Sequence, residues 1–314
     1  MLKKIKALIL TGILTVGVVG CSSKTKEEVV EDKIKVGLVL STGGVNDQSF
    51  NQSAWEGALK ASEELGVEVS YLESNSDADY MQNIETAIDQ DSDLVVGVGF
   101  QVGDAIKEAS KAYPNQNFVT IDSENENLDN VRAITFSEEE AGYLTGLIAG
   151  KMTKTNVVSW IGGFDIPSCS NFYVGYEKGV KEANPNAKVL KQFINSFTDA
   201  SKGKVVAEQM INNNSDIIFT ACGGGNTGVL EAVKEKGIKA IGVDMPMNYL
   251  APEHVVTSAL KNVGEGLKLT IKDYVDNNFT AGEVKYNLSN GGVGYEKTDL
   301  IPNDIVEYVE GKIK

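Results

Sequence analysis

The sequence predicts an α/β protein of two similar lobes, each built from a parallel sheet flanked by helices. Short apolar runs typical of strands alternate with helix-like segments along most of the chain, which is the pattern of successive βαβ units. Landmarks also recur at a nearly constant spacing. Phe50 and Phe172 are 122 residues apart, and so are Asp122 and Asp244. Agreement among independent landmarks indicates two copies of one βα unit.

In the first half, the apolar run VGLVL at residues 36–40 opens the predicted sheet. The run LVVGV at residues 94–98 is wholly apolar, as expected for a strand that is buried on both faces. Further strands are predicted at residues 68–72 and 118–121. Helices are predicted between the strands, at about residues 53–65, 80–90 and 104–112.

The second half repeats this order of elements. Strands are predicted at residues 157–161, from residue 189, at 216–220 and at 240–243, with helices near 173–183, 204–212 and 227–236. The segment 256–260 is expected to cross back toward the first lobe, where a helix near 263–275 would pack. The last part, with Tyr286 and the glycines of residues 291–294, is expected to return to the second lobe. The expected lobes are therefore residues 34–137 plus 259–284, and residues 138–258 plus 285–314.

The first twenty residues have the composition of a secretory signal peptide. Lys3, Lys4 and Lys6 precede an uncharged, mostly apolar run at residues 7–20, too short to span a bilayer comfortably. The run ends in VVGC, which resembles the bacterial lipobox. That resemblance implies cleavage before Cys21 and attachment of a diacylglycerol, with acyl chains such as palmitate. An ordinary secretory signal followed by a chance cysteine is the alternative. Residues 21–33 are polar and charged, and they are expected to form a flexible tether.

The charge of the chain excludes one class of partner. The formal net charge is −15, and loss of three lysines with the signal peptide gives −15 − 3 = −18. Nucleic-acid binding needs a basic surface, so no nucleic acid is expected as a partner. Attraction to anionic lipid is disfavoured as well, so a lipid anchor would have to hold the protein at the membrane.

No arrangement typical of an enzyme or a metal site is found. Cys169 and Cys222 are the cysteines that follow Cys21, and they form neither a CxxC motif nor a zinc-site spacing. Two free thiols are favoured over a disulfide. The only histidine, His254, lies in a proline-containing loop, and no GxSxG motif occurs. The stretch GGGNTG at residues 223–228 does match the dinucleotide fingerprint. A ligand loop with glycines for close approach is the simpler interpretation, so we expect neither an enzyme nor a bound cofactor.

The loops after the strands are the expected ligand site, because open α/β sheets bind ligands at the carboxyl ends of their strands. The first such loop, residues 41–51 (STGGVNDQSFN), offers hydrogen-bonding groups at Asn46 and Asp47 and a flat ring at Phe50. An alternative is equally open. The same loop could simply cap the following helix, with Asp47 or Ser49 as the cap and Phe50 in the core.

The segment GGVNDQSFNQSAWEG at residues 43–57 resembles the signature of the basic membrane protein family, the purine-nucleoside-receptor-like binding lipoproteins of ABC importers. Further stretches that match this family in order are FSEEEAGYLTG, WIGGF, SFTD, GVD, TSALK and GGVG. The resemblance implies a two-lobed type I periplasmic-binding-protein fold that holds a small molecule between its lobes. It also implies a monomer, lipid-anchored on the extracytoplasmic face of the cell membrane, that delivers a nucleoside to an ABC permease.

The resemblance also implies roles for particular residues. Phe50 would stack on the base, Asp122 would hydrogen-bond the base, and Asp244 with Lys261 would hold the ribose hydroxyls. The further candidates for the ligand site are Ser41, Thr42, Asn46, Asp47, Trp160, Gly163, Phe164, Gly223 and Gly224.

One departure from the family pattern bears on the ligand. Some relatives carry a second aromatic residue after the strand that matches residues 216–220, where this chain has ACGGG. Another ring, such as Trp160, Phe164 or Phe100, would then close the aromatic sandwich. Otherwise the ligand is not a purine nucleoside but a different small ring compound. The pair Ser41 and Thr42 is also less acidic than expected for gripping a purine edge.

Overall fold

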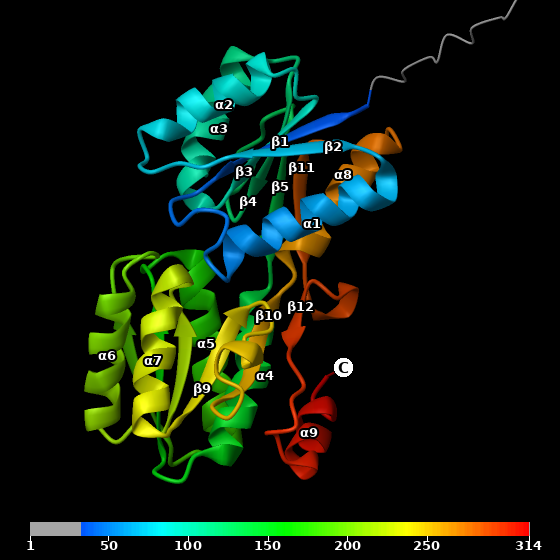
Figure 1. The fold of residues 1–314 in the computed structure, drawn as a ribbon. Coiled ribbons are helices and arrows are strands. Elements are labelled where there is room, and N and C mark those ends of the chain that lie inside the picture. Colours follow the sequence, from blue (N-terminus) through cyan, green and yellow to red (C-terminus); the bar gives the residue numbers. More distant parts are fainter. Residues whose placement is uncertain (1–32, 314) are drawn as a thin grey trace, which may run out of the picture. The chain divides into compact units, whose positions relative to one another are not determined.

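The computed structural model describes residues 33–313 (Figure 1). The predicted signal peptide, Cys21 and nearly all of the predicted tether lie outside the described residues. Within them, no helix combines the length and the apolar character needed to cross a membrane.

The first sheet contains six strands in the order β11-β5-β4-β3-β1-β2, and all neighbouring strands are parallel. Its strands are β1 (Lys35–Leu40), β2 (Glu68–Leu72), β3 (Leu94–Val98), β4 (Asn117–Ile121), β5 (Val131–Phe136) and β11 (Gly282–Tyr286). Helices α1 (Phe50–Leu65), α2 (Asp79–Asp89), α3 (Phe100–Ala112) and α8 (Val263–Val275) flank this sheet.

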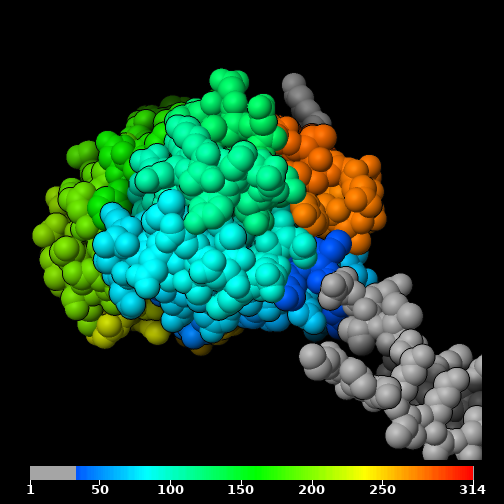
Figure 2. Space-filling view, turned by 90° about the horizontal axis from the view of Figure 1, so that it is seen from above, coloured from blue at the N-terminus to red at the C-terminus, as the bar shows by residue number. Residues whose placement is uncertain are grey.

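Helices cover both faces of the first sheet because its central strands are apolar on both faces. In β1, Leu38 packs into the same core as α1, whereas its neighbour Val39 packs into the core formed with α2 and α3. Helices α1 and α8 cross closely at Gly57, where a Cβ atom would lie only 2.2 Å from the carbonyl oxygen of Gly264. Seen from above, α8 (orange) forms part of the surface beside the blue and cyan first half of the chain (Figure 2).

The second sheet has the equivalent strand order, β12-β10-β9-β8-β6-β7, which confirms the predicted fold class and its internal repeat. Its strands are β6 (Val157–Gly162), β7 (Lys188–Phe193), β8 (Ile217–Ala221), β9 (Lys239–Asp244), β10 (Val255–Lys261) and the antiparallel β12 (Val293–Tyr295). The helices of this half are α4 (Glu138–Met152), α5 (Pro167–Ala183), α6 (Ala200–Asn212), α7 (Asn226–Lys236) and α9 (Asn303–Glu310).

The elements that were not predicted from the sequence include β5 and α4, as well as β11, β12 and α9. Helix α4 contacts α5 along its length and also β10, β12 and α9. Ten of its fifteen residues are buried, from Glu138 to Gly150. A helix buried on nearly all sides lacks the apolar stripe by which a surface helix is identified in a sequence.

The crossings between the sheets differ from the prediction in two places. Strand β10 remains in the second sheet as far as Lys261, so the chain crosses only between Lys261 and Val263. Strand β11 pairs with β5, and the pair Tyr286 and Phe136 places Tyr286 in the first sheet rather than the second lobe. The apolar run of β10 does not specify which sheet it joins, and β11 is a half-exposed edge strand with a weak pattern.

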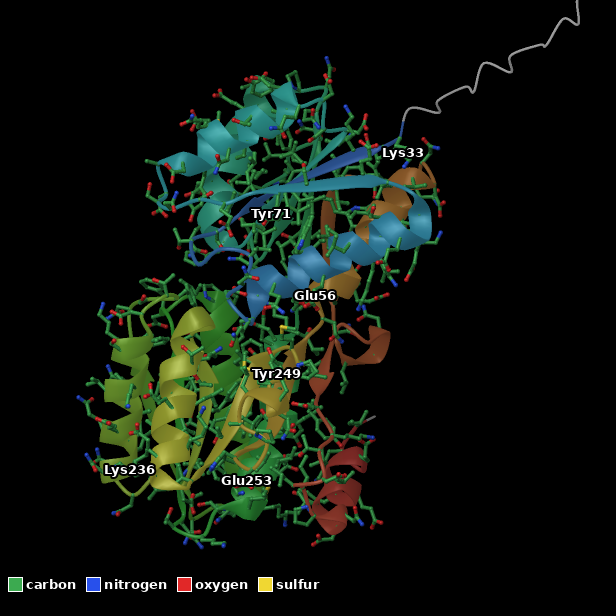
Figure 3. All side chains as sticks on the ribbon, in the orientation of Figure 1. Lys33, Glu56, Tyr71, Lys236, Tyr249 and Glu253 are labelled. Carbon is green, nitrogen blue, oxygen red and sulfur yellow. The ribbon has the colours of Figure 1, made fainter. Side chains whose placement is uncertain are left out.

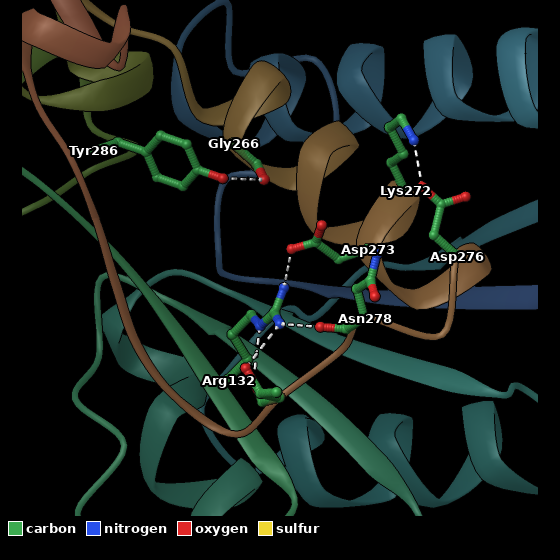
Figure 4. A network of polar contacts seen from close by, with 8 residues as sticks. Arg132, Gly266, Lys272, Asp273, Asp276, Asn278 and Tyr286 are labelled. Atoms are coloured by element: carbon green, nitrogen blue, oxygen red, sulfur yellow. Dashed lines mark hydrogen bonds and ion pairs between the residues drawn. The ribbon is translucent and has the colours of Figure 1, made fainter.

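A buried arginine anchors the connection from α8 to β11 (Figure 4). Arg132 on β5 is the only arginine of the chain, and 3% of its side chain is exposed. Its guanidinium donates to the carboxylate of Asp273 at 2.7 Å and to the carbonyl oxygen of Thr280 at 2.9 Å. Several donors in a planar fork are available only from arginine. The group fixes where β11 enters the first sheet.

Candidate functional site

A cavity lies where the carboxyl ends of the two sheets meet. The cavity volume is about 70 Å³. This is room for several water molecules and is more than a packing void provides. This is the edge at which α/β sheets bind ligands. Eight of the candidate residues line it, namely Ser41, Thr42, Asp47, Phe50, Asp122, Gly223, Asp244 and Lys261.

Two of the remaining candidates lie away from the cavity. Asn46 is exposed on the loop that leads to α1. Trp160 is fully buried in β6, where its ring packs edge-on against Tyr173 and Phe193. Trp160 is therefore a core residue and does not present a face to a ligand.

The last three candidates contact one residue that does line the cavity, Phe197. The ring of Phe164 lies 5.1 Å from the Phe197 ring, and Gly163 and Gly224 lie against the same residue. Of the three rings considered as replacements for the second aromatic, only Phe100 lines the cavity itself.

A buried ionic cluster forms the polar part of the site. The ammonium of Lys261, whose side chain is 2% exposed, lies 2.5 Å from the carboxylate of Asp122 and 2.9 Å from that of Glu138. The same ammonium lies 5.3 Å from the centre of the Phe50 ring. The cluster joins the end of β10 in the second sheet to the end of β4 in the first. It also brings a cation, two anions and an aromatic ring together at the cavity.

Carboxyl groups outnumber ammonium groups at the cavity. Among the described residues that line it, Lys261 is the only one with a cationic side chain. Burial raises the pKa of Asp122 to about 6, with Lys261 opposing the rise and Glu138 adding to it. Burial likewise raises the pKa of Asp244 to about 6, against the opposing effects of Lys261 and of a hydrogen bond from the Ser49 hydroxyl. The site therefore accepts hydrogen-bond donors and disfavours anions.

The two aspartates at matched positions of the repeat share an unusual backbone conformation. Asp122 and Asp244 each follow the last core residue of a strand, and each has a φ of 64°. Non-glycine residues seldom adopt this left-handed conformation, and such outliers cluster at functional sites. One oxygen of Asp122 is buried without a hydrogen-bond partner among the described residues. This oxygen is an acceptor available to a ligand.

Asp47 performs the capping role that the sequence left open. Its carboxylate accepts hydrogen bonds from the backbone N–H groups of Ser49, Asn51 and Gln52, at 2.9, 2.9 and 3.1 Å. These donors would otherwise be unsatisfied at the start of α1. Phe50 begins that helix and is half-buried, so the cap fixes the position of a ring that lines the cavity. The loop therefore caps α1 and also places the Phe50 ring at the cavity.

Several lining residues were not predicted from the sequence: Asn51, Gln101, Cys169, Phe172 and Phe197. Phe172 could have been found, because it is the repeat partner of Phe50. Asn51 exchanges hydrogen bonds with Ser41 through both its amide oxygen and its amide nitrogen, and so orders the first loop. Phe197 comes from the loop between β7 and α6, to which the repeat assigns no role.

The remaining chemistry-bearing residues have structural explanations. Cys169 and Cys222 are free and buried, and burial raises the pKa of each thiol to about 12, so both are protonated at neutral pH. A ring nitrogen of His254 lies 2.8 Å from the carbonyl oxygen of Ile238. Among the described residues, no cluster of His, Cys, Asp or Glu could hold a metal ion.

The glycines of the GGGNTG stretch serve packing as well as the site. Gly223 has a φ of 57° and lines the cavity. A Cβ atom on Gly228 would lie 1.7 Å from the carbonyl oxygen of Ala200, so glycine is required where α7 crosses α6. The match to the dinucleotide fingerprint is therefore explained without a dinucleotide.

Comparisons with known proteins show similarity along nearly the whole chain. A family model described as "ABC transporter substrate-binding protein PnrA-like" matches residues 34–314. A relative from Lactococcus lactis subsp. cremoris, named ABC transporter nucleoside-binding protein BmpA, is 35% identical over 100% of this chain and 99% of its own. Basic membrane protein A of Borreliella burgdorferi is 36% identical over 91% of this chain and 86% of its own.

Solved structures give the same fold. A solute-binding protein of an ABC transporter system from Aeropyrum pernix K1 superposes with a TM-score of 0.79 at 29% identity, covering 89% of this chain and 85% of that one. A periplasmic solute-binding protein from Actinobacillus succinogenes with bound D-allose gives a TM-score of 0.68 at 15% identity. It covers 86% of this chain and 100% of its own, and at this identity the likeness concerns the fold alone.

Proposed function

Because the chain belongs to the PnrA-like family of ABC transporter substrate-binding proteins, we propose that it captures a nucleoside, foremost a purine nucleoside, in the cavity between its sheets. Like its relatives, it is a substrate-binding protein and not an enzyme. The observation that carries the proposal is the meeting of the Phe50 ring with the ammonium of Lys261 and the carboxylates of Asp122 and Asp244. The name of the L. lactis relative supports the same ligand class.

Each of these groups has a part in holding such a ligand. The ring of Phe50 offers a face on which a planar base can stack. The unpartnered oxygen of Asp122 can accept an N–H donor of the base. Asp244 can accept the two neighbouring hydroxyl groups of a ribose, and Lys261 neutralises these carboxylates while donating hydrogen bonds. Charge-assisted bonds of this kind orient a ligand as well as hold it.

A different small ring compound is the second candidate. Gly223 lies in the segment where some relatives carry a second aromatic residue, and it offers no ring. A ligand less flat than a purine would then fit the same carboxylates. Release of small molecules from denatured protein, followed by mass spectrometry, distinguishes the two candidates directly.

We further propose that the protein is a monomer of two lobes joined by three crossing segments. The first lobe consists of residues 34–136 and 263–286, and the second lobe consists of residues 138–261 and 293–313. Ligand contacts with both lobes would favour their closure through differential binding. Glu56 on α1 and Tyr249 lie where the two lobes meet (Figure 3). Small-angle scattering with ligand should show a smaller radius of gyration than without it.

A nucleoside should raise the melting temperature, and its 5′-monophosphate should not. A ligand at about 100 times its Kd stabilises the folded protein by about 2.7 kcal/mol. A phosphate group would bring negative charge to a cavity in which carboxylates already outnumber ammonium groups. Thermal unfolding at pH 7.5 with adenosine, guanosine, inosine, uridine and their monophosphates makes the comparison. Stabilisation by a monophosphate that equals or exceeds that by its nucleoside would contradict the proposed ligand class.

We also propose that Cys21 anchors the protein by a thioether-linked diacylglycerol on the extracytoplasmic face of the membrane, where it delivers its ligand to an ABC permease. Names such as basic membrane protein among the relatives support a membrane-associated location. Cys21→Ser should leave the protein unprocessed or in the soluble fraction, because acyl chains supply the membrane affinity. Fractionation and immunoblotting check this. A variant that partitions with the membrane as the wild type does would defeat the lipoprotein assignment.

A further inference from the structure

A buried carboxylate lies behind the cavity wall. Glu138 is the first residue of α4, and 3% of its side chain is exposed. One of its carboxylate oxygens lies 2.9 Å from the ammonium of Lys261, and the other accepts a hydrogen bond from the side-chain amide of Asn171 at 3.3 Å. Among the described residues, Lys261 lines the cavity and Glu138 does not. Glu138 can therefore act on a ligand through Lys261 and through its charge, but not by contact.

The packing of α4 against α5 fixes the position of this carboxylate. A Cβ atom on Gly175 of α5 would lie 2.0 Å from the carbonyl oxygen of Glu139, so glycine is required where the two helices approach each other. Asn171 lies one turn before Gly175 on the same face of α5, and the close approach brings its amide to Glu138. A negative charge in the first turn of a helix is also favoured by the helix dipole. Glu138 is thus held in place independently of Lys261.

The two ion pairs of Lys261 connect different parts of the molecule. Lys261 ends β10 and Glu138 begins α4, and these two elements pack together within the second half of the chain. Asp122 instead ends β4 in the first sheet. If the two proposed lobes part to admit a ligand, the pair with Asp122 is separated and the pair with Glu138 remains. Because a buried ammonium without an anion is costly, Glu138 keeps Lys261 paired at the cavity in either arrangement.

The charge of Glu138 also affects what the cavity presents to a ligand. Lys261 faces the carboxyl groups of Asp122 and Asp244 inside the cavity and that of Glu138 outside it. Because Glu138 takes up much of the positive charge of Lys261, the two aspartates are left with an excess of negative charge. Burial is the main cause of the raised pKa of Asp122; Lys261 opposes the rise and Glu138 adds to it. A residue outside the cavity is therefore coupled to an acceptor inside it.

We propose that Glu138 is a positioning residue that holds and neutralises Lys261 from outside the cavity, and so makes the site select uncharged ligands over anionic ones. The proposal rests on the proposed function, because it assumes that a nucleoside binds beside Lys261. It assigns the discrimination against anions to a side chain that does not touch the ligand.

The test measures charge selectivity directly. The probes are the 5′-carboxylate and the neutral 5′-carboxamide of whichever of adenosine, guanosine, inosine and uridine binds the wild type most tightly. These probes have nearly the same shape and differ by one charge. Calorimetry at pH 7.5 should show that the wild type binds the carboxylate at least about tenfold more weakly than the carboxamide. Glu138→Gln keeps the shape of the side chain and removes its charge, and it should reduce this ratio at least about fivefold.

Glu139→Gln is the matched control. Glu139 is the next residue in the same helical turn and is exposed, so its substitution removes the same charge from the start of α4 without affecting Lys261. This variant should keep the wild-type ratio. An equal loss of affinity for both probes in Glu138→Gln, with the ratio unchanged, would overturn the proposal and leave Glu138 a purely structural role. An equal change of the ratio in Glu139→Gln would also overturn it.

A second readout needs only the unmodified nucleoside, and it decides if neither probe fits the wild-type cavity. Affinity should fall as the pH drops through about 6, because a protonated Asp122 is a weaker acceptor. In Glu138→Gln the midpoint of this fall should move to lower pH, since Glu138 no longer raises the pKa of Asp122. An unmoved midpoint would overturn the proposal. Besides Glu138, the titratable groups around Lys261 are Asp122 on β4, Asp244 on β9, the Cys169 thiol on α5 and, beyond Asp244, Asp47 before α1.

Two further outcomes are kept apart by the design. If Glu138→Gln does not fold, Lys261→Met is compared with the double variant that carries both substitutions. Glu138→Gln should lower the carboxylate-to-carboxamide ratio of Kd values, or the pH midpoint, in that background too, and no change would overturn the proposal. A wild-type protein that binds none of the four nucleosides would overturn the proposed function, and this proposal with it.

Discussion

Lys261→Met is expected to lower the free energy of unfolding by about 3–5 kcal/mol at pH 7.5, the largest effect on stability of any single substitution proposed for this site. The substitution removes the cation that lies between Asp122 and Glu138 while leaving both carboxyl groups buried. Methionine has nearly the same length as lysine, so little volume is lost. The cost arises from buried charge without a partner.

The loss should shrink as the pH falls to 5. The pKa of Asp122 is about 6 in the folded protein, above its value of 3.8 in an unfolded chain. Protonation of Asp122 in the folded protein therefore contributes its full stabilisation below about pH 4, and this contribution is lost as the pH rises through about 6. Since Lys261 lowers this pKa, Lys261→Met raises it further. In the variant Asp122 therefore stays neutral over a wider pH range, and a neutral carboxyl group needs no cation beside it. The difference in free energy of unfolding between variant and wild type is then greatest above pH 6.

Lys268→Met serves as the control, because Lys268 forms only surface ion pairs with Glu64 and Glu265. Such exposed pairs contribute about 0–1 kcal/mol, so this variant should unfold nearly as the wild type does. Urea unfolding of the three proteins at pH 5.0 and 7.5 measures the difference. Equal destabilisation of Lys261→Met at both pH values would mean that packing, and not charge, accounts for the role of Lys261.

The fold could be predicted from the sequence because the same order of elements occurs in both halves of the chain, so that each half supports the prediction for the other. The landmarks at Phe50 and Phe172 proved to lie at the start of one helix and within the first turns of its counterpart. Asp122 and Asp244 proved to end equivalent strands with the same backbone conformation. The crossings could not be predicted, because a strand such as β11 belongs to a sheet only through its partner. That partner is β5, about 150 residues earlier in the chain.

The candidate site could be predicted only where the repeat or a known motif marked a residue. Asp122 follows from topology, since parallel strands end at one edge of the sheet, whereas Lys261 was marked only by the resemblance to the family. Phe197 does not follow from topology, because it comes after β7, an edge strand of the second sheet. Its signal was indirect and lay in Gly163 and Gly223, which the sequence analysis had named as candidate site residues. The residue that approaches them could be identified only in three dimensions.

Asp244→Ala should weaken binding of a ribonucleoside at least tenfold while scarcely changing the binding of its free base. Asp244 is 8% exposed, and its carboxyl group lines the cavity. If it accepts the two ribose hydroxyls, its removal leaves those donors unpaired in a closed cleft, at a cost of roughly 1–3 kcal/mol each. A free base has no such hydroxyls and loses nothing. The measurement belongs at pH 7.5, where a carboxyl group with a pKa of about 6 is ionised.

Phe50→Ala is the matched variant, because it removes the stacking face and should weaken nucleoside and base alike, by about 1–3 kcal/mol. Calorimetry with one nucleoside, its 2′-deoxy form and its base separates the two roles. The 2′-deoxynucleoside should show a smaller loss with Asp244→Ala than the ribonucleoside, since one hydroxyl is already absent. Equal losses on nucleoside and base would mean that Asp244 acts by holding Ser49 and the loop before α1 in place. The sugar would then be bound elsewhere, and Asp122, with its unpartnered oxygen, would be the next residue to test.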